Sequence, residues 1–108
     1  MIELTAEKIS ELAANTDNII MSSHVNERCL KRIIDSNDVL NVLRNGEIIE
    51  HYPKDYPYPS CLELGHTIGG KPLHVCCAVG EGKLWVITAY YPDKNKWEND
   101  FKTRKAVE

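Results

Sequence analysis

The 108 residues carry 43% apolar and 27% charged side chains, with a formal net charge of −3 at neutral pH. This composition is typical of one folded domain and excludes a disordered chain, and the charge gives no overall attraction to nucleic acid. No run of about 18 apolar residues occurs, so we expect no membrane-spanning helix. The acidic N-terminal stretch MIELTAEKISEL is unlike a secretory signal peptide. We therefore expect residues 1–108 to form a single cytoplasmic domain.

Three helices are predicted in the first half of the chain. They span about residues 5–14, 22–34 and 36–46, and the first two are separated by a short extended segment, NIIMS. Thr5, Ser22 or Ser23, and Ser36 are suited to cap the helix N-termini, because their hydroxyl oxygens accept hydrogen bonds from free backbone N–H groups. Gly46 is suited to end the third helix in a left-handed conformation.

The second half of the chain predicts an antiparallel sheet. Four segments have the composition of strands: GEIIEHY, SCLELGHTI, KPLHVCCAV and KLWVITAYY. Glycine-containing turns join the last three, and the proline-rich stretch HYPKDYPYPSC cannot form a helix or a central strand. A short helix around residues 96–101 is expected to close the chain. Helices followed by antiparallel strands predict an α+β fold, with the helices packed on one face of a four-stranded antiparallel sheet.

The two glycine turns predict which side chains share the open face of this sheet. A two-residue loop at Gly69-Gly70 and a three-residue loop at residues 80–82 place His74 opposite Thr88. A two-residue second loop would place Ala89 there instead, and is less favoured because it turns Thr88 toward the core. The preferred register exposes four side chains suited to proton transfer or phosphate binding: Glu63, His74, Thr88 and Tyr90. Either Glu50 or His51, at the end of the GEIIEHY strand, shares this face as a supporting residue.

The second predicted helix carries a candidate catalytic pair. His24 and Arg28 are four residues apart, so they lie one turn apart on the polar face of this helix. A histidine beside an arginine suits phosphate chemistry, because the cation holds the anion while an imidazole, which titrates near neutral pH, moves a proton. The alternative is an ordinary charged surface in which Glu27 pairs with Lys31.

A zinc site is a further alternative. The four cysteines are more typical of free thiols than of disulfides, since no signal peptide precedes them. The preferred register places Cys61, His74 and Cys76 on one face, which would supply three ligands. No C-x-x-C or H-x-x-x-H spacing supports this zinc site. In another alternative, His74 has no chemical role and only hydrogen-bonds Thr88 on the sheet surface.

Four blocks of the sequence resemble the bacterial domain-of-unknown-function family 4258. They are MSSHVNERCLKR, VLRNGEIIEHYPKDYPYPSCLELG, PLHVCCAV and LWVITAYYPDKNKWENDFKTRK, within about residues 18–105. This family looks related to the RelE/ParE and BrnT toxins, in which N-terminal helices pack on an antiparallel sheet. Matched residue by residue, the family pattern falls on residues 46–50 and on His24, Arg28, His74, Thr88 and Tyr90. The strands here carry fewer lysines and arginines than those of RelE-like ribonucleases.

The resemblance implies a metal-independent endoribonuclease that needs no cofactor and is paired with an antitoxin protein. In this hypothesis His74 and His24 transfer protons, Arg28 stabilises the phosphorane, and Thr88 and Tyr90 contact the phosphate. Glu50 and Glu63 have supporting roles. The alternative is a non-enzymatic domain that binds a partner protein, or a second copy of itself, through the Tyr-Pro loop and an exposed sheet edge.

Overall fold

A computed structural model describes residues 4–106. Three α-helices, one 3-10 helix and five strands follow one another in the described chain. Their order is α1 (Ala6–Ala13), the 3-10 helix η1 (Thr16–Asn18), β1 (Ile19–Ile20), α2 (Ser23–Lys31), α3 (Ser36–Asn45), β2 (Glu47–Tyr52), β3 (Ser60–His66), β4 (Pro72–Gly80) and β5 (Lys83–Tyr90). The α+β class predicted from the sequence is confirmed. None of these helices has the length and apolar composition that crossing a membrane requires.

The helix N-termini follow from capping side chains. Thr5 Oγ1 accepts a hydrogen bond from Lys8 N (3.1 Å), and Ser22 Oγ accepts one from Val25 N (3.2 Å). The third helix departs from the prediction, because Asp35 and not Ser36 is its N-cap, with Asp38 completing a capping box. The negative charges of these two carboxylates also stabilise the helix, because they lie at the positive N-terminal end of its dipole.

The helix C-termini differ from the sequence prediction. Helix α2 ends at Lys31, and Ile33 has a positive φ of 57° that turns the chain away before residue 34. Gly46 has a φ of −79°, so it is not the left-handed residue that we expected. A glycine is needed there for space, since a Cβ on Gly46 would come within 2.6 Å of the carbonyl oxygen of Val42.

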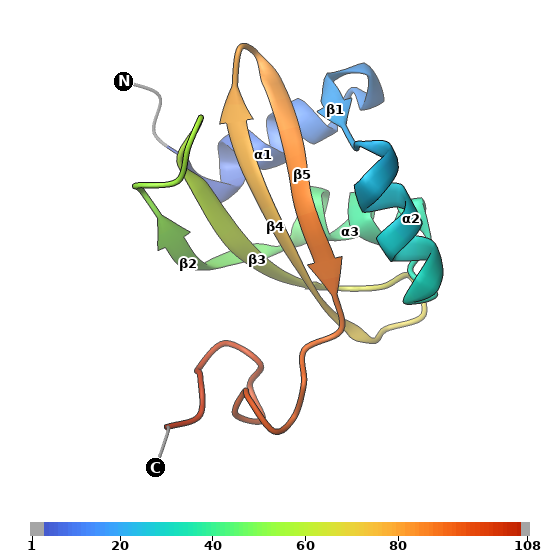
Figure 1. Cartoon of the computed structure of the whole chain (residues 1–108), viewed down its shortest axis with the longest axis vertical. Coiled ribbons are helices and arrows are strands. Elements are labelled where there is room, and N and C mark those ends of the chain that lie inside the picture. Colours follow the sequence, from blue (N-terminus) through green and yellow to red (C-terminus); the bar gives the residue numbers. More distant parts are fainter. Residues whose placement is uncertain (1–3, 107–108) are drawn as a thin grey trace.

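The sheet has five strands, not the predicted four. Its order is β1-β5-β4-β3-β2, and the neighbours are antiparallel except for β1, which is parallel to β5 (Figure 1). The extra strand is the NIIMS segment, in which Ile19 and Ile20 pair with the edge of β5. A strand of two residues carries no alternation of apolar and polar side chains, so its pairing was not predictable from its pattern.

The β3–β4 register is shifted by one residue from the prediction. The loop spans residues 67–71 and not two glycines, because Thr67 N donates to Lys71 O (2.8 Å) and Lys71 N donates to Thr67 Oγ1 (3.0 Å). Leu64 therefore lies opposite His74. A shift of one residue turns every side chain of a strand to the other face. Glu63 consequently points toward the helices and not to the open face.

The β4–β5 register also corrects the prediction. Glu81 and Gly82 form a two-residue turn in which both have positive φ angles, 54° and 71°. The pairing shifts again beside Ile87, which is the extra residue of a β-bulge on β5. As a result Tyr90, and not Thr88 or Ala89, lies opposite His74.

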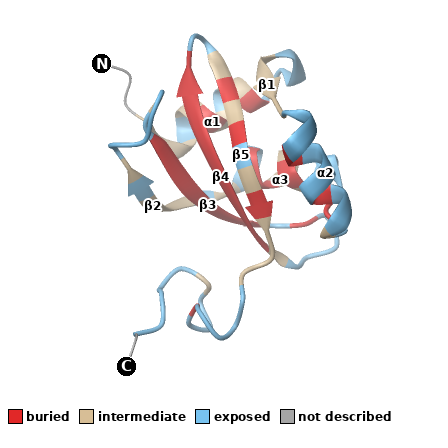
Figure 2. Cartoon of the chain, in the orientation of Figure 1, coloured by how far each residue is buried: buried red, intermediate tan, exposed pale blue. Residues whose placement is uncertain are grey.

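Apolar side chains are buried on both faces of the sheet. The larger cluster lies between the helices and one face and includes Ile9, Val39, Leu43, Leu73 and Val75. The smaller cluster includes Leu62, Cys76 and Trp97 and lies on the opposite face. Residues 92–106, which we call the C-terminal strap, contribute Trp97 and Phe101 to it. Figure 2 accordingly shows β3 and β4 buried along most of their length.

The strap is not the short helix predicted around residues 96–101. Its residues form turns, and Trp97 pairs with Arg104 in a single antiparallel bridge. Phe101 has a positive φ of 58°, which is incompatible with a continuing right-handed helix. The strap thereby covers a sheet face that the sequence predicted to be open.

Candidate functional site

A small pocket lies where α2 packs beside β5, in the part of β5 that follows its pairing with β1. It encloses about 240 Å³ and is lined by His24, Val25, Arg28, Arg32, Ile87, Thr88 and Ala89. We call it the α2–β5 pocket. Helix α2 buries Val25 and Cys29 and leaves His24 and Arg28 exposed. The sequence pattern of one apolar and one polar helix face thus brings two predicted site residues to the mouth of the pocket.

The polar side chains that line this pocket are two guanidinium groups, an imidazole and a hydroxyl. Arg32 Nη1 donates to the carbonyl oxygen of Ala89 (2.7 Å) and lies 3.4 Å from Thr88 Oγ1. Within residues 4–106, the side chains of His24 and Arg28 make no hydrogen bond or ion pair. No carboxylate lines the pocket. The arrangement is therefore suited to hold an anion, and planar guanidinium groups match phosphate oxygens particularly well.

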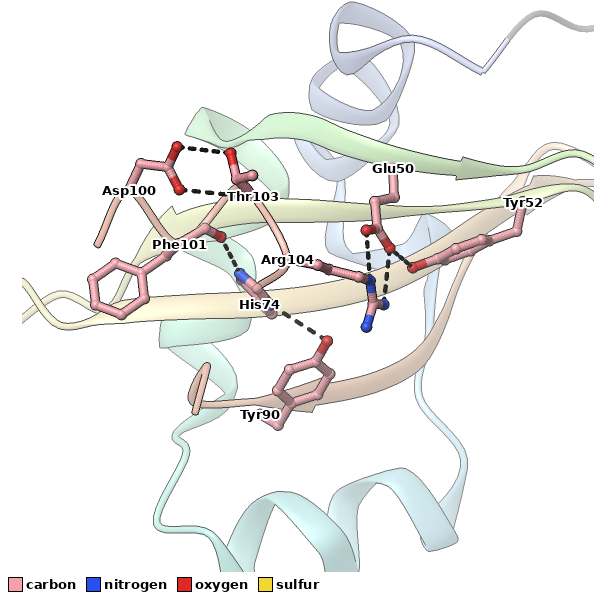
Figure 3. A network of polar contacts seen from close by, with 8 residues as sticks. All are labelled: Glu50, Tyr52, His74, Tyr90, Asp100, Phe101, Thr103 and Arg104. Atoms are coloured by element: carbon pink, nitrogen blue, oxygen red, sulfur yellow. Dashed lines mark hydrogen bonds and ion pairs between the residues drawn. The ribbon is translucent and has the colours of Figure 1, made fainter. Parts of the chain in front are cut away.

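His74 lies elsewhere, in the cluster beneath the strap (Figure 3). Its exposed fraction is 0%, which corrects the prediction of a surface imidazole. Nε2 lies 2.7 Å from the carbonyl oxygen of Phe101, so this nitrogen carries the proton, and Nδ1 accepts from the hydroxyl of Tyr90 (3.3 Å). The Trp97 ring packs edge-on against the imidazole at 4.6 Å. Burial lowers the pKa of His74, although the Phe101 hydrogen bond acts in the opposite direction.

Glu50 belongs to the same cluster and anchors the strap. Its carboxylate accepts two hydrogen bonds from Arg104, at 2.8 and 3.0 Å, and a third from the hydroxyl of Tyr52 at 2.5 Å (Figure 3). The Arg104 hydrogen bonds hold the pKa of Glu50 below its ordinary value. Glu50 thus supports the C-terminal strap, and its side-chain partners among the described residues are Arg104 and Tyr52.

Glu63 is separated from both places. It lies on the helix side of the sheet with an exposed fraction of 0%, and neither carboxyl oxygen has a hydrogen-bond partner among the described residues. Burial raises its pKa to about 8. The sequence predicted Glu63 on the open face. The observed β3–β4 register differs from the predicted one by one residue, so Glu63 and Cys61 both lie on the helix side.

The zinc alternative fails for the same reason. Cys61 lies directly opposite Cys77 in the larger cluster, with their sulfur atoms 3.9 Å apart, while Cys76 belongs to the cluster on the other face. Cys61 therefore cannot share a metal ion with His74 and Cys76. Within residues 4–106 no group of three or more His, Cys, Asp or Glu side chains is placed to hold a metal ion.

The predicted site residues are consequently divided among three places, with Glu63 alone in the core on the helix side of the sheet. His24, Arg28 and Thr88 come together, whereas His74, Tyr90 and Glu50 form the cluster beneath the strap. Arg32 is a member of the pocket that the prediction omitted. A signal was present, since residues 24, 28 and 32 follow the spacing of successive helix turns.

A family model matches residues 21–91 of the chain and describes a domain of unknown function, DUF4258. The matched region runs from α2 to the end of β5, so it includes every residue of the α2–β5 pocket. The strap follows the matched region. Neither the curated proteins nor the solved structures give a match to the chain. Because the family model covers more than half of its length, the chain belongs to the DUF4258 family.

Proposed function

We propose that the protein is a metal-independent endoribonuclease that binds the scissile phosphate of RNA in the α2–β5 pocket. The observation that supports this function is the convergence of His24, Arg28, Arg32 and Thr88 in one pocket that no carboxylate lines. A negative lining residue would repel the phosphodiester. Its absence leaves Arg28, whose side chain makes no ion pair within residues 4–106, available to the substrate, and Arg32 adds a second positive charge.

Each polar side chain has a role in the proposed reaction. His24 accepts the proton of the ribose 2′-hydroxyl as the 2′-oxygen forms a bond to phosphorus. Arg28 and Arg32 stabilise the negative charge of the phosphorane, and the Thr88 hydroxyl donates to a phosphate oxygen. The bond from phosphorus to the 5′-oxygen then breaks, this oxygen takes a proton from water, and protonated His24 returns its proton to the hydroxide that remains. The products are a 2′,3′-cyclic phosphate and a 5′-hydroxyl.

The proposal leaves His74 and Tyr90 out of the proton transfer. Both lie beneath the strap, and the imidazole has partners for both ring nitrogens. A substrate would have to displace Trp97 and Phe101 to reach His74. In the proposal His74 orders the strap and therefore acts on the fold, not on the substrate.

Cleavage of a labelled single-stranded RNA in the presence of EDTA tests this function. We expect products with a 2′,3′-cyclic phosphate end and no cleavage of the DNA of the same sequence. His24→Gln and Arg28→Ala should each lower kcat/KM by about 100-fold or more. Lys31→Ala is the matched control, because Lys31 is on the same helix but pairs with Glu27 and lines no part of the pocket. Equal cleavage by wild-type protein and His24→Gln would refute the proposal, as would loss of cleavage in EDTA.

A second candidate is an interaction domain for a partner protein, such as an antitoxin, or for a second copy of the chain. Among the described residues, large apolar side chains are exposed at Leu30, Ile33, Tyr56, Ile68 and Ile87. Exposed apolar and aromatic side chains are typical anchors of protein interfaces. Size-exclusion chromatography with light scattering, together with co-purification from the native host, tests it. A monomer that retains no partner would remove this candidate.

A further inference from the structure

An aromatic groove adjoins the α2–β5 pocket on the other side of β5. It encloses about 470 Å³ and is lined by Asp55, Tyr56, Pro57, Tyr58, Ala78, Trp85, Val86 and Ile87. This volume is within the range of about 300–1,000 Å³ that is usual for small-molecule sites. The groove is formed by the loop between β2 and β3 where it lies against the end of β4 and the middle of β5.

The groove is built to present aromatic rings. Tyr58 and Trp85 are stacked, with ring centroids 6.1 Å apart and an angle of 30° between the ring planes. Gly80 allows this arrangement, since a Cβ there would come within 2.5 Å of the Tyr58 ring. The indole N–H of Trp85 donates to the Gly80 carbonyl oxygen (3.0 Å), so this polar atom needs no further partner. Tyr56 completes the set with an exposed fraction of 95%.

One residue joins the groove to the cationic pocket. Ile87, the extra residue of the bulge on β5, lines both. The two hollows are therefore adjacent across β5 and differ in chemistry. One offers two arginines and the Thr88 hydroxyl, and the other offers aromatic faces and a single carboxylate, Asp55.

Single-stranded nucleic acids combine the two corresponding groups at every nucleotide. The phosphate requires cations, and the base has apolar faces that stack on tyrosine and tryptophan. Asp55 would orient the bound nucleotide, because its negative charge repels the phosphate. Ser60 donates a hydrogen bond to Oδ2 of Asp55, whereas Oδ1 accepts none from the described residues. A carboxylate oxygen without a partner can accept a hydrogen bond from an amino group of a base.

We propose that the groove binds a base of single-stranded RNA next to the phosphate held by Arg28 and Arg32, with the base stacked on Tyr56, Tyr58 and Trp85. This inference rests on the proposed function and adds the substrate class. A duplex is excluded as substrate, because its bases are paired and stacked on one another. Asp55 favours bases that carry an amino group, so cytosine is preferred over uracil.

Fluorescence polarisation with labelled 2′-O-methyl RNA hexamers tests the inference without cleavage. Wild-type protein should bind oligocytidine more tightly than oligouridine, and both more tightly than an abasic hexamer with the same phosphates. Tyr56→Ala should weaken binding of the base-containing hexamers by about tenfold and leave the abasic hexamer unchanged. Ile68→Ala is the control, since Ile68 is also exposed but lines neither hollow.

The outcomes separate the two proposals. Loss of binding in Arg28→Ala with no effect of Tyr56→Ala would keep the phosphate site and overturn the base site. Equal binding of the cytidine, uridine and abasic hexamers would also overturn it. Absence of any RNA binding, with a co-purifying protein released by Tyr56→Ala, would overturn both and would assign the groove to a protein partner.

Discussion

Glu63 is the most unusual residue of the described chain. A carboxyl group without a hydrogen-bond partner in an apolar core is costly to ionise, so it keeps its proton in the folded protein. Both of its strand partners, Val75 and Ile48, are apolar. The cost of burying this side chain is therefore controlled by pH.

The stability of the protein should fall as the pH rises from about 5 to 8. Burial raises the pKa of Glu63 from the ordinary value of 4.5 to about 8. Between these values the unfolded chain loses the proton and the folded chain retains it, so the free energy of unfolding decreases by ~1.4 kcal/mol per pH unit. Above pH 8 both states are ionised and this contribution no longer changes.

Urea denaturation of Glu63→Gln at several pH values measures this effect. Because glutamine does not titrate, the variant should lack this loss of stability. The free energy of unfolding of the variant minus that of wild-type protein should therefore rise steadily from pH 5 to 8. Glu11→Gln, an exposed glutamate of α1, should keep the wild-type pH dependence. Parallel pH profiles of wild-type protein and Glu63→Gln would show that Glu63 is ionised in the fold.

The residue Ile33, just after the end of α2, has a strained backbone conformation. Ile33 is β-branched and has a φ of 57°, a region that β-branched residues strongly disfavour, and its side chain is 86% exposed. Ile33→Gly should therefore raise the free energy of unfolding by ~0.5–1 kcal/mol, since the strain is relieved and little packing is lost. Leu30→Gly, at an exposed helical position, should lower it by ~1 kcal/mol. A loss of stability in Ile33→Gly would contradict the strained conformation.

The C-terminal strap is held by Arg104. This residue pairs with Glu50 and lies over the Trp97 ring, with 4.6 Å between the guanidinium carbon and the ring centroid. Arg104→Ala should lower the free energy of unfolding by ~1 kcal/mol, because it removes a partly exposed ion pair and a cation–π contact. It should also increase acrylamide quenching of Trp97 in a Trp85→Phe background, where Trp97 is the sole tryptophan.

A matched control uses a more exposed ion pair. Lys31 and Glu27 have side chains that are 71% and 66% exposed, so Lys31→Ala should change the free energy of unfolding by less than about 0.5 kcal/mol. Arg104→Ala with unaltered quenching of Trp97 would mean that the strap remains in place without this anchor.

The sequence predicted elements better than it predicted how they pair. Thr5 and Ser22 marked helix starts, since a hydroxyl before an amphipathic run has a local physical meaning. The length of the β3–β4 loop did not follow from its two glycines. The Thr67 side chain closes the loop, which has five residues. The error of one residue was enough to misplace Glu63 and Cys61. The bulge at Ile87 likewise left no mark in the pattern of its neighbours.

The candidate site was predictable where it depends on one helix and not where it depends on tertiary contacts. His24 and Arg28 are brought together by helix geometry alone, so their proximity followed from spacing. His74 was correctly placed on the sheet face away from the helices. Its burial depends on Trp97 and Phe101 of the strap, and a segment without periodic apolar residues gives no indication of the surface that it covers.

At the scale of the whole molecule, the charge distribution decides how a protein of net charge −3 could bind RNA in the proposed way. Two arginines and no carboxylate line the α2–β5 pocket, while Glu50 and Glu47 are paired with Arg104 and Lys102 on the strap. RNA binding should therefore be local, and salt should weaken it only modestly, because few phosphates are contacted.

Mapping where RNA binds on the protein is the most direct test of the proposed site at the α2–β5 pocket. We would record amide chemical-shift changes of the ¹⁵N-labelled protein on addition of a 2′-O-methyl RNA hexamer at low salt. The account predicts changes concentrated in residues 22–32 and 85–89, with smaller ones in the loop that carries Tyr56 and none in the strap. Changes confined to the strap and β2, or no changes at all, would contradict it.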